Sequence, residues 1–307
     1  MCSLFLQGDD GLDIVQELQD AGFARVIVLD GAECGVPDVG SLVLALWPYA
    51  AERTPMTGEA WVHPYYFASQ AAYVAADNIA RRHSGDGVIW REDIRLKPIF
   101  ARLPGFAQGR NTISSLSGCG SRFHVQMLTV TPAMAPTHHL EAEEHPLRCG
   151  DCHLCERACP TNALEGGVFH RERCLRNWQV GGTVYPEEVR RQMGTRLIGC
   201  DECQRCCPHN PAPEGENAPM PVTLEEIMRS PKEAAVALRR HIGATVTMPN
   251  RLLMGACIIA GVTGRRDLIP HLWRHAGSPS AAVAEHAGWA LMELGVRYIP
   301  PEEPEIP

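Results

Sequence analysis

The chain has 307 residues, of which 45% are hydrophobic and 21% are charged, and its formal net charge at pH 7 is −8. This length suffices for two or three domains, each with its own core. The mild acidic charge gives no support to a general nucleic-acid or anionic-membrane surface, because such partners favour basic patches, although a local basic groove remains compatible with it. The apolar runs fall short of the roughly 18 residues that a membrane-spanning helix needs, so we expect no membrane partner.

The N-terminal part of the chain contains a predicted strand and a predicted helix. The apolar segment SLVLALWPYA (residues 41–50) ends at Trp-Pro and is typical of a buried strand. A shared apolar face predicts a helix over residues 65–83, and this face is formed by Ala72, Ala75, Ala76 and Ile79.

A stretch with two carboxylates and then a glycine-rich stretch follow the helix. The first, GVIWREDIRLKPIFARL, carries Glu92 and Asp93. The second, GFAQGRNTISSLSGCGSRFHVQMLTV, extends from Gly105 to Val130. On its own the glycine-rich stretch predicts no more than a turn.

Nine of the thirteen cysteines lie in one short region, between residues 148 and 210. No N-terminal segment has the basic start, apolar run and small-residue cleavage site of a secretory signal, so we expect a cytoplasmic protein. In a reducing cytosol, cysteines at short spacings are more often metal ligands than disulfide partners. The region therefore predicts a metal site.

The first run of cysteines has the spacing of bacterial two-cluster ferredoxins. It reads Cys149-x2-Cys152-x2-Cys155-x3-Cys159-Pro160. In that pattern three thiolates come from one tight loop, and the cysteine before the proline binds the other cluster. Two Cys-x2-Cys pairs would satisfy zinc, which has no use for the third cysteine and the Cys-Pro ending. We therefore predict iron–sulfur clusters.

The second run departs from the ferredoxin pattern. It reads Cys200-x2-Cys203-x2-Cys206-Cys207-Pro208, so its last two cysteines adjoin. Either one of these two is spare or another cysteine completes the set, and Cys174, between the runs, could be that ligand. Eight ligands from nine cysteines would give two [4Fe-4S] clusters.

The C-terminal third is predicted to be helical. Three short stretches with apolar faces, RLLMGACIIAGV, LIPHLWRHAG and SAAVAEHAGWALMELG, are separated by turn sequences. They are similar to HEAT-type helical repeats, which bury one face by stacking on a neighbour, so we expect them to dock on the rest of the chain. The proline-rich residues 208–223 mark the boundary before them.

The two cysteine runs, with Cys174 between them, resemble in order and spacing the epoxyqueuosine reductase family. The matching motifs are CGDCHLCERACPTNAL and MGTRLIGCDECQRCCPHN. This family consists of cobalamin- and iron–sulfur-dependent enzymes that act at the last step of queuosine synthesis in tRNA. The resemblance implies that the first cluster is bound by Cys149, Cys152, Cys155 and Cys207. It implies that the second is bound by Cys159, Cys174, Cys200 and Cys203, which leaves Cys206 spare.

The resemblance also covers the glycine-rich stretch and the C-terminal helices. It implies that base-off cobalamin, without a histidine on cobalt, packs against Gly109, Arg110, Asn111, Thr112, Gly120 and Ser121. The implied fold class is α+β, with an N-terminal α/β cobalamin-binding domain (1–139), a ferredoxin-like double-cluster domain (140–215) and a HEAT-like α-helical domain (216–307).

Three features depart from the family pattern. The sequence after Cys174 differs, the N-terminal part is shorter, and no aspartate falls in register with the family's catalytic aspartate. Glu92 and Asp93 are the nearest carboxylates and are therefore the candidate proton donors, provided that burial raises the pKa of one of them. These departures indicate a shorter, divergent relative.

The function that the resemblance implies is a cobalamin-dependent oxidoreductase. Epoxyqueuosine in tRNA is the best named substrate, although the acidic charge does not favour tRNA binding, and a related unknown substrate is the other possibility. We expect a monomer that takes electrons from an external donor of the flavodoxin or ferredoxin type. One alternative is an iron–sulfur electron-transfer protein with no substrate of its own. Another is a HEAT-type interaction protein whose clusters are structural.

Overall fold

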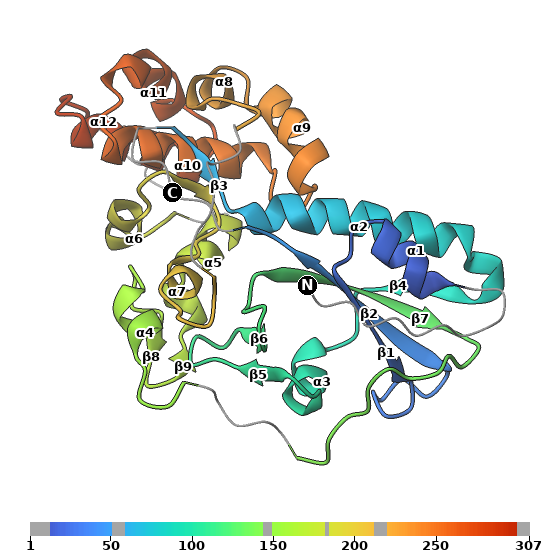
Figure 1. Cartoon of the computed structure of the whole chain (residues 1–307). Coiled ribbons are helices and arrows are strands. Elements are labelled where there is room, and N and C mark those ends of the chain that lie inside the picture. Colours follow the sequence, from blue (N-terminus) through green and yellow to red (C-terminus); the bar gives the residue numbers. More distant parts are fainter. Residues whose placement is uncertain (1–12, 51–58, 144–148, 182–183, 212–219, 300–307) are drawn as a thin grey trace, which may run out of the picture. The chain divides into compact units, whose positions relative to one another are not determined.

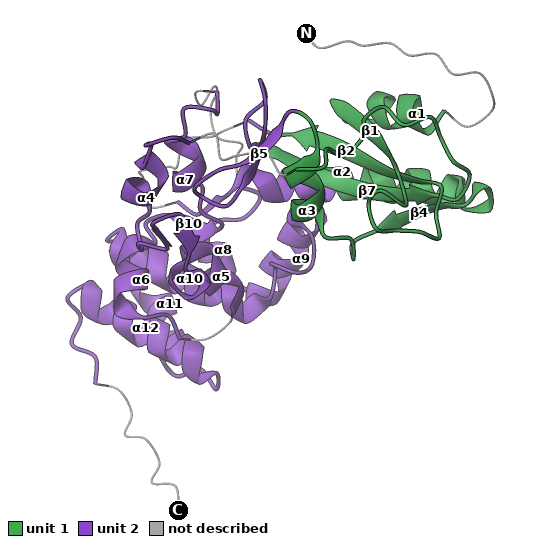
Figure 2. Ribbon diagram, turned by 90° about the horizontal axis from the view of Figure 1, so that it is seen from below, with its two compact units in different colours: residues 1–48, 71–104, 123–143 green, residues 49–70, 105–122, 144–307 purple. Residues whose placement is uncertain are grey.

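The structure is a computed structural model that describes residues 13–50, 59–143, 149–181, 184–211 and 220–299. The chain divides into two compact units (Figure 2). Unit 1 comprises residues 1–48, 71–104 and 123–143, and unit 2 comprises residues 49–70, 105–122 and 144–307. The cysteine runs therefore share a unit with the C-terminal helices and with most of the glycine-rich stretch. The expected domain boundary at residues 215 and 216 lies outside the described residues.

Unit 1 is built around a four-stranded sheet with the strand order β1-β2-β7-β4 (Figure 1). Neighbouring strands are antiparallel throughout this sheet. Its elements are α1 (Ile14–Asp20), β1 (Arg25–Asp30), β2 (Ser41–Pro48), α2 (Pro64–Arg82, in unit 1 from Ala71 on), η1 (Ser84–Asp86), β4 (Val88–Arg91), α3 (Leu96–Arg102) and β7 (Phe123–Val130).

The antiparallel pairing differs from the α/β topology expected for the N-terminal domain. β2 and β4 run parallel to each other, because each is antiparallel to β7, which lies between them. The chain connects β2 to β4 through α2, as in a split β-α-β unit. The sequence predicted the strand β2 and the helix α2, but neither β4 nor the pairing of β7 between β2 and β4.

The core of unit 1 confirms the predicted strand and helix. In β2, residues 41–46 are all buried. On α2, Ala72, Ala76 and Ile79 are buried against the sheet, and Ala75 packs beside them. α1 contributes Ile14 and Leu18 to the same cluster. The apolar faces of α1 and α2 therefore pack in one core with side chains from all four strands.

Unit 2 combines short strands with many helices (Figure 1). β3 pairs with β10, β5 with β6 and β8 with β9. The elements are β3 (Trp61–Val62), β5 (Phe106–Gln108), β6 (Ser114–Leu116), α4 (Leu154–Ala158), β8 (Leu164–Glu165), β9 (Val168–Phe169), η2 (Arg171–Arg173), α5 (Leu175–Gly181), α6 (Glu187–Gln192), β10 (Arg196–Ile198), α7 (Glu202–Arg205), α8 (Leu224–Arg229), α9 (Pro231–Ile242), α10 (Pro249–Val262), η3 (Arg266–Leu268), α11 (Ile269–Ala276) and α12 (Ala281–Glu293).

The predicted C-terminal helices form, and sequence signals explain where they begin. A proline occupies the first or second position of α9, α10 and α11, where its missing N–H costs no helical hydrogen bond. α8 begins with a capping box in which Thr223 and Glu226 satisfy each other's backbone N–H groups. Ten consecutive residues of α10, from Leu252 to Gly261, are buried, so this helix is central to the bundle.

One hydrophobic core joins the C-terminal helices to the segment between the two cysteine runs. Leu175, Val189 and Leu197 belong to the same buried cluster as the apolar side chains of α8 to α12. Polar contacts also cross this junction: the Tyr185 N–H donates to Nε2 of His286 (3.1 Å), Arg190 donates to Glu285 (2.9 Å), and Arg191 donates to Glu293 (2.8 Å). The helices therefore dock on the cysteine region, as expected. None of the helices in the described residues has the length and apolarity needed to span a membrane.

Candidate metal centre

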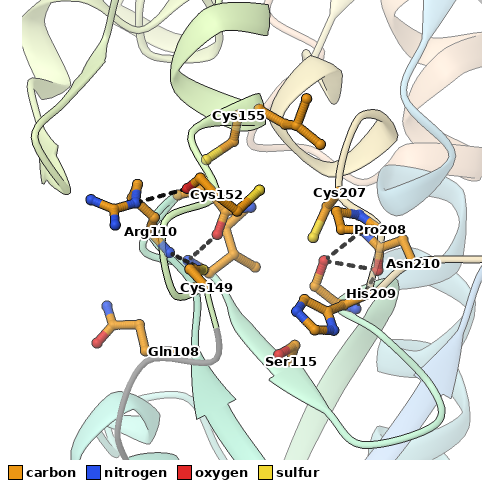
Figure 3. A pocket seen from close by; sticks show the side chains of 15 residues that line it. Gln108, Arg110, Ser115, Cys149, Cys152, Cys155, Cys207, Pro208, His209 and Asn210 are labelled. Atoms are coloured by element: carbon orange, nitrogen blue, oxygen red, sulfur yellow. Dashed lines mark hydrogen bonds between the residues drawn. The ribbon is translucent and has the colours of Figure 1, made fainter.

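The four cysteines assigned to the first cluster line a single pocket (Figure 3). Cys149 and Cys152 lie in the turn before α4, Cys155 lies within α4, and Cys207 follows α7. Segments some fifty residues apart in sequence therefore bring their thiols to the same place. Four sulfur donors around one space are the ligand set of a [4Fe-4S] cluster.

The four cysteines assigned to the second cluster lie close enough to influence one another. Burial is the main reason that the pKa of the Cys203 thiol is well above its usual range, and the neighbouring thiols of Cys200, Cys174, Cys159 and Cys206 raise it further. Cys174 lies between η2 and α5, so the element between the runs delivers it to this group. This grouping supports the ligand set that the resemblance implies.

The chemistry of these thiols fits iron–sulfur clusters. Burial raises the pKa of Cys200 to about 12, so this thiol keeps its proton at neutral pH unless a cation stabilises the thiolate. Bound iron supplies that positive charge and displaces the proton. In the described part of the chain, no three His, Cys, Asp or Glu side chains are arranged as ligands of one metal ion.

Cys206 lies between the two groups of thiols. Its Sγ is 3.8 Å from the carbonyl oxygen of Cys203, to which it can donate. Burial raises its pKa to about 11, and the thiols of Cys155 and Cys207 contribute to this shift. The spare cysteine is therefore a neighbour of both expected clusters.

The loop predicted to contact cobalamin packs against the cysteine runs. Gly109, Arg110, Asn111 and Ser121 line the same pocket as the first group of thiols. Gly120 has a φ of +72°, and a Cβ at this position would lie 2.2 Å from Oδ1 of Asn210. The close approach that requires this glycine is thus to the chain's own Cys-Pro-His-Asn segment. Thr112 adopts a positive φ of 61°, which is uncommon for a residue other than glycine.

Hydrogen bonds fasten this loop to the second cysteine run. The Ser121 N–H donates to Oδ1 of Asn210 (2.6 Å), and Nδ2 of Asn210 donates to the carbonyl of Gln204 (2.7 Å). Nε2 of Gln204 in turn donates to the carbonyl of Ser121 (3.0 Å). Asn210 and Gln204, both present in the family's motif, therefore hold the loop in place.

A buried polar group beside the second run was missed by sequence reasoning. Asp201, His63 and Arg122 are at most 6% exposed. Burial raises the pKa of Asp201 to about 6 and lowers that of His63 to about 3. Asp201 Oδ1 and one Nη of Arg122 make no hydrogen bond within the described residues. The only sign of this buried group in the sequence was the position of Asp201 between Cys200 and Cys203. Nothing in the sequence indicated that His63 lies near Asp201.

The candidate proton donors do not have the environment that the role requires. Glu92 and Asp93 are both exposed in the segment after β4. Nε and Nη2 of Arg91 each donate to the Asp93 carboxylate at 2.7 Å. This pairing lowers the pKa of Asp93 to about 2, so it is ionised at neutral pH. A buried acid with a raised pKa was expected; instead both side chains are exposed, and Arg91 lowers the pKa of Asp93.

Comparison with known proteins agrees with this site. Residues 148–210 match the family described as the 4Fe-4S double cluster binding domain. An epoxyqueuosine reductase from Xanthomonas campestris pv. campestris is 30% identical over 164 residues, which cover 48% of this chain and 45% of the relative. The chain spans less than two thirds of the length of the curated relatives that it matches.

Two solved structures share the fold. An epoxyqueuosine reductase from Bacillus subtilis matches with a TM-score of 0.71 at 17% identity, covering 91% of this chain and 89% of that chain. An epoxyqueuosine reductase with an epoxyqueuosine-modified tRNA-Tyr stem loop matches with a TM-score of 0.69 at 17% identity, covering 92% of this chain and 89% of that chain. The mixed helix and strand content and the resemblance seen in the cysteine motifs are thereby confirmed.

Proposed function

Because the chain is related in sequence to the epoxyqueuosine reductases and shares their fold, we propose that it is a cobalamin- and iron–sulfur-dependent reductase. Its substrate is epoxyqueuosine in tRNA or a related compound. The observation that carries the proposal is that Cys149, Cys152, Cys155 and Cys207 line one pocket. The other four assigned cysteines also lie near one another, since the thiols of Cys159, Cys174 and Cys200 raise the pKa of Cys203.

Two [4Fe-4S] clusters are the resident electron carriers in this proposal. Cys149, Cys152, Cys155 and Cys207 hold the first, and Cys159, Cys174, Cys200 and Cys203 hold the second. When bound, such clusters supply electron transfer at low potential. The four thiols of the second group are partly buried, and burial raises the pKa of Cys203 well above its usual range. An external flavodoxin- or ferredoxin-type donor would supply the electrons to a monomeric enzyme.

Cobalamin is the proposed site of substrate reduction. Four of the residues assigned to it, Gly109, Arg110, Asn111 and Ser121, lie beside the first cluster, because they line the same pocket as the first group of thiols. Cobalamin, when bound, supplies a strongly reducing cobalt centre. The chain's own part is to orient the cofactor and exclude water. We assign no proton donor, because Asp93 is ionised and exposed.

The substrate assignment to tRNA rests on the relatives. Overall the chain is acidic, but Arg239 and Arg240 are exposed at the end of α9 and offer a local phosphate contact. Arg265 and Arg266 are less suited to this role, because Arg265 is paired with Asp267 (2.7 Å) and Arg266 donates to the carbonyl of Leu294. Salt-sensitive tRNA binding that weakens in Arg239→Ala/Arg240→Ala would support a tRNA substrate.

The organisation that goes with this function has three parts: residues 1–139, 140–215 and 216–307. We interpret the last part as HEAT-like, since α8 packs on α9, α9 on α10, and both α10 and α11 on α12. Stacked helices of this kind offer an extended surface for a macromolecular substrate.

One observation favours a second candidate, an electron-transfer protein with no substrate of its own. Asn210 and the carbonyl of His209 fill the space beside Gly120, where the resemblance implies contact with a corrin ring. Anaerobic reconstitution with iron, sulfide and cobalamin separates the two candidates. A corrinoid absorption spectrum that stays with the protein through gel filtration supports the reductase. If the protein has its full cluster content but retains no corrinoid, the reductase proposal fails and the electron-transfer protein takes its place.

A further inference from the structure

Arg110 makes three hydrogen bonds to the turn that carries the first two cysteines and approaches one carboxylate of the helix that follows. Its backbone N–H donates to Sγ of Cys149 (3.2 Å). Its side chain donates from Nε to the carbonyl of Cys152 (3.0 Å) (Figure 3). Its Nη2 donates to the carbonyl of Gly150 (2.9 Å). Nη1 also lies 4.0 Å from the carboxylate of Glu156 on α4. One residue outside the cysteine runs thus spans the whole turn from Cys149 to Cys152.

Asn111, the next residue, makes the corresponding contact with the second run. Its Nδ2 donates to the carbonyl of Cys203 (3.2 Å), and its Oδ1 accepts from the N–H of Ile113 (3.2 Å). The residue is only 8% exposed. Arg110 and Asn111 therefore connect the turn at residues 109–112 to both cysteine runs, one for each expected cluster.

The backbone shape of the 109–112 turn restricts the directions in which the side chains of Arg110 and Asn111 can point. A Cβ on Gly109 would lie 2.6 Å from Oδ1 of Asn111, so a larger residue there would force the Asn111 amide to shift. Thr112 holds a positive φ of 61°, and its N–H donates to the carbonyl of Gly109 (2.8 Å). The backbone is thereby fixed in the geometry that directs Arg110 and Asn111 to opposite cysteine runs.

An arginine suits these contacts better than a lysine would. The two carbonyl acceptors, of Gly150 and Cys152, receive separate N–H groups of one planar guanidinium. A lysine ammonium lacks that forked geometry. The N–H bond to Cys149 Sγ withdraws electron density from a ligand sulfur, and hydrogen bonds to sulfur and local charge are what set the potential of such a cluster.

We propose that Arg110 is a positioning residue for the first cluster, holding the Cys149–Cys152 turn and raising the reduction potential of the cluster bound there. Asn111 performs the corresponding bracing of the second run through Cys203. The proposal rests on the clusters of the proposed function, but it needs neither cobalamin nor a substrate. Positive charge beside a cluster and hydrogen bonds donated to its sulfurs both stabilise the more negative, reduced state. A side-chain substitution keeps the backbone N–H that donates to Cys149 but removes the charge and the bonds that hold the turn, so it lowers the potential.

The test compares Arg110→Gln with Arg110→Lys and with Arg157→Gln. Arg157 is an exposed arginine on α4, two residues from Cys155, and so controls for the loss of one positive charge near the same cluster. Each protein is reconstituted anaerobically with iron and sulfide alone. Midpoint potentials are measured by EPR-monitored titration, and cluster lability is measured as the rate of iron transfer to a ferrous chelator.

We expect Arg110→Gln to lower the potential of one cluster, to leave the other unchanged and to release iron about tenfold faster. Arg110→Lys should recover most of the potential, because it keeps the charge, but should still release iron faster. Arg157→Gln should resemble the unsubstituted protein. Potentials and release rates in Arg110→Gln equal to those of the unsubstituted protein would overturn the proposal.

Two further outcomes remain decisive. If Arg110→Gln takes up no clusters, Arg110→Lys decides, and unaltered iron release in that variant overturns the proposal. If the unsubstituted protein itself holds no [4Fe-4S] clusters, the proposed function fails together with the positioning role. Two clusters that are indifferent to Arg110 would remove the positioning role alone.

Discussion

Cys206 shows how much a single residue position depends on three-dimensional context. Its sequence neighbour Cys207 belongs to the first group of thiols and lines the pocket, whereas Cys206 does not. Two adjacent thiols rarely point to the same cluster in suitable directions, and here Cys206 is directed toward the carbonyl of Cys203. Cys174 has no such substitute, because it is the one cysteine that the segment between the runs delivers to the second group.

At this scale we expect Cys206→Ser to keep both clusters and Cys174→Ser to lose or convert one. Iron and sulfide analysis after anaerobic reconstitution should give about eight irons per chain for Cys206→Ser and fewer for Cys174→Ser. The reverse pattern would show that the second ligand set is wrong.

The spacing of the cysteines was enough to predict the cluster chemistry from sequence. The role of the surrounding residues was not, because Arg110 and Ser121 are distant in sequence from the runs that they contact. Only the fold brings the Arg110 N–H to Cys149 and Ser121 to Asn210. The carboxylates were misjudged for the same reason, since exposure and the pairing of Asp93 with Arg91 are tertiary features.

The turn from Gly118 to Ser121 illustrates packing at the scale of one element. Gly118 and Gly120 both have positive φ, of 77° and 72°. A Cβ on Gly118 would meet nothing within 4 Å, whereas one on Gly120 would meet Asn210 and the carbonyl of His209. The two glycines therefore carry the same conformational cost of substitution but a different steric cost.

This pair provides a matched test of the docked turn. Gly118→Ala should lower the free energy of unfolding by about 1–2 kcal/mol, the cost of a left-handed alanine. Gly120→Ala should lower it further, because the methyl group displaces Asn210 from Ser121. Chemical denaturation of the reconstituted proteins measures both effects. Equal destabilisation of the two variants would show that the turn is not packed on the second cysteine run.

The hydrogen bond between His286 of α12 and the Tyr185 N–H, in the segment before α6, is sensitive to pH. His286 is fully buried, and burial is the main cause that lowers its pKa to about 4. The folded protein keeps this histidine neutral, while the unfolded chain protonates it below about pH 6.5. Stability contributed by the neutral histidine is therefore present above pH 6.5 and is lost as the pH falls toward 4.

We expect His286→Gln to be less stable than the unsubstituted protein at pH 7 but to lose less stability between pH 6.5 and pH 4.5. The difference in slope should not exceed about 1.4 kcal/mol per pH unit, the limit for one group. His241→Gln, at an exposed histidine of α9, is the control and should not change the slope. Parallel pH profiles for His286→Gln and the unsubstituted protein would contradict the assigned buried contact, whichever is the more stable.

Across the whole molecule, the cysteine region and the C-terminal helices depend on one core. Val189 and Leu197 are buried in the same cluster as the side chains of α10 and α12. The sequence predicted the buried strand β2, the helix α2, the C-terminal helices α10, α11 and α12, and their order. It could not predict that β7 separates β2 from β4, or that residues 49–70 and 105–122 join unit 2, because these depend on long-range pairing.

This shared core predicts that iron stabilises more than the cysteine loops. Removal of iron by a chelator under anaerobic conditions should lower the midpoint of thermal unfolding of the helices by about 5 °C or more, because ligand binding to the native state is linked to folding. Circular dichroism at a helical wavelength measures this change. An unchanged midpoint in the iron-free protein would indicate that the helical end folds independently of the clusters.

The most direct test of the proposed function is a turnover measurement. The protein, reconstituted with about eight irons per chain and with cobalamin, is incubated anaerobically with a low-potential reductant and a tRNA stem loop carrying epoxyqueuosine. Mass spectrometry of the digested nucleosides then follows the loss of the epoxide oxygen. We predict conversion to queuosine that requires both cofactors and is abolished in Cys207→Ser. Unchanged epoxyqueuosine in the presence of fully loaded protein would contradict the assignment of epoxyqueuosine as the substrate.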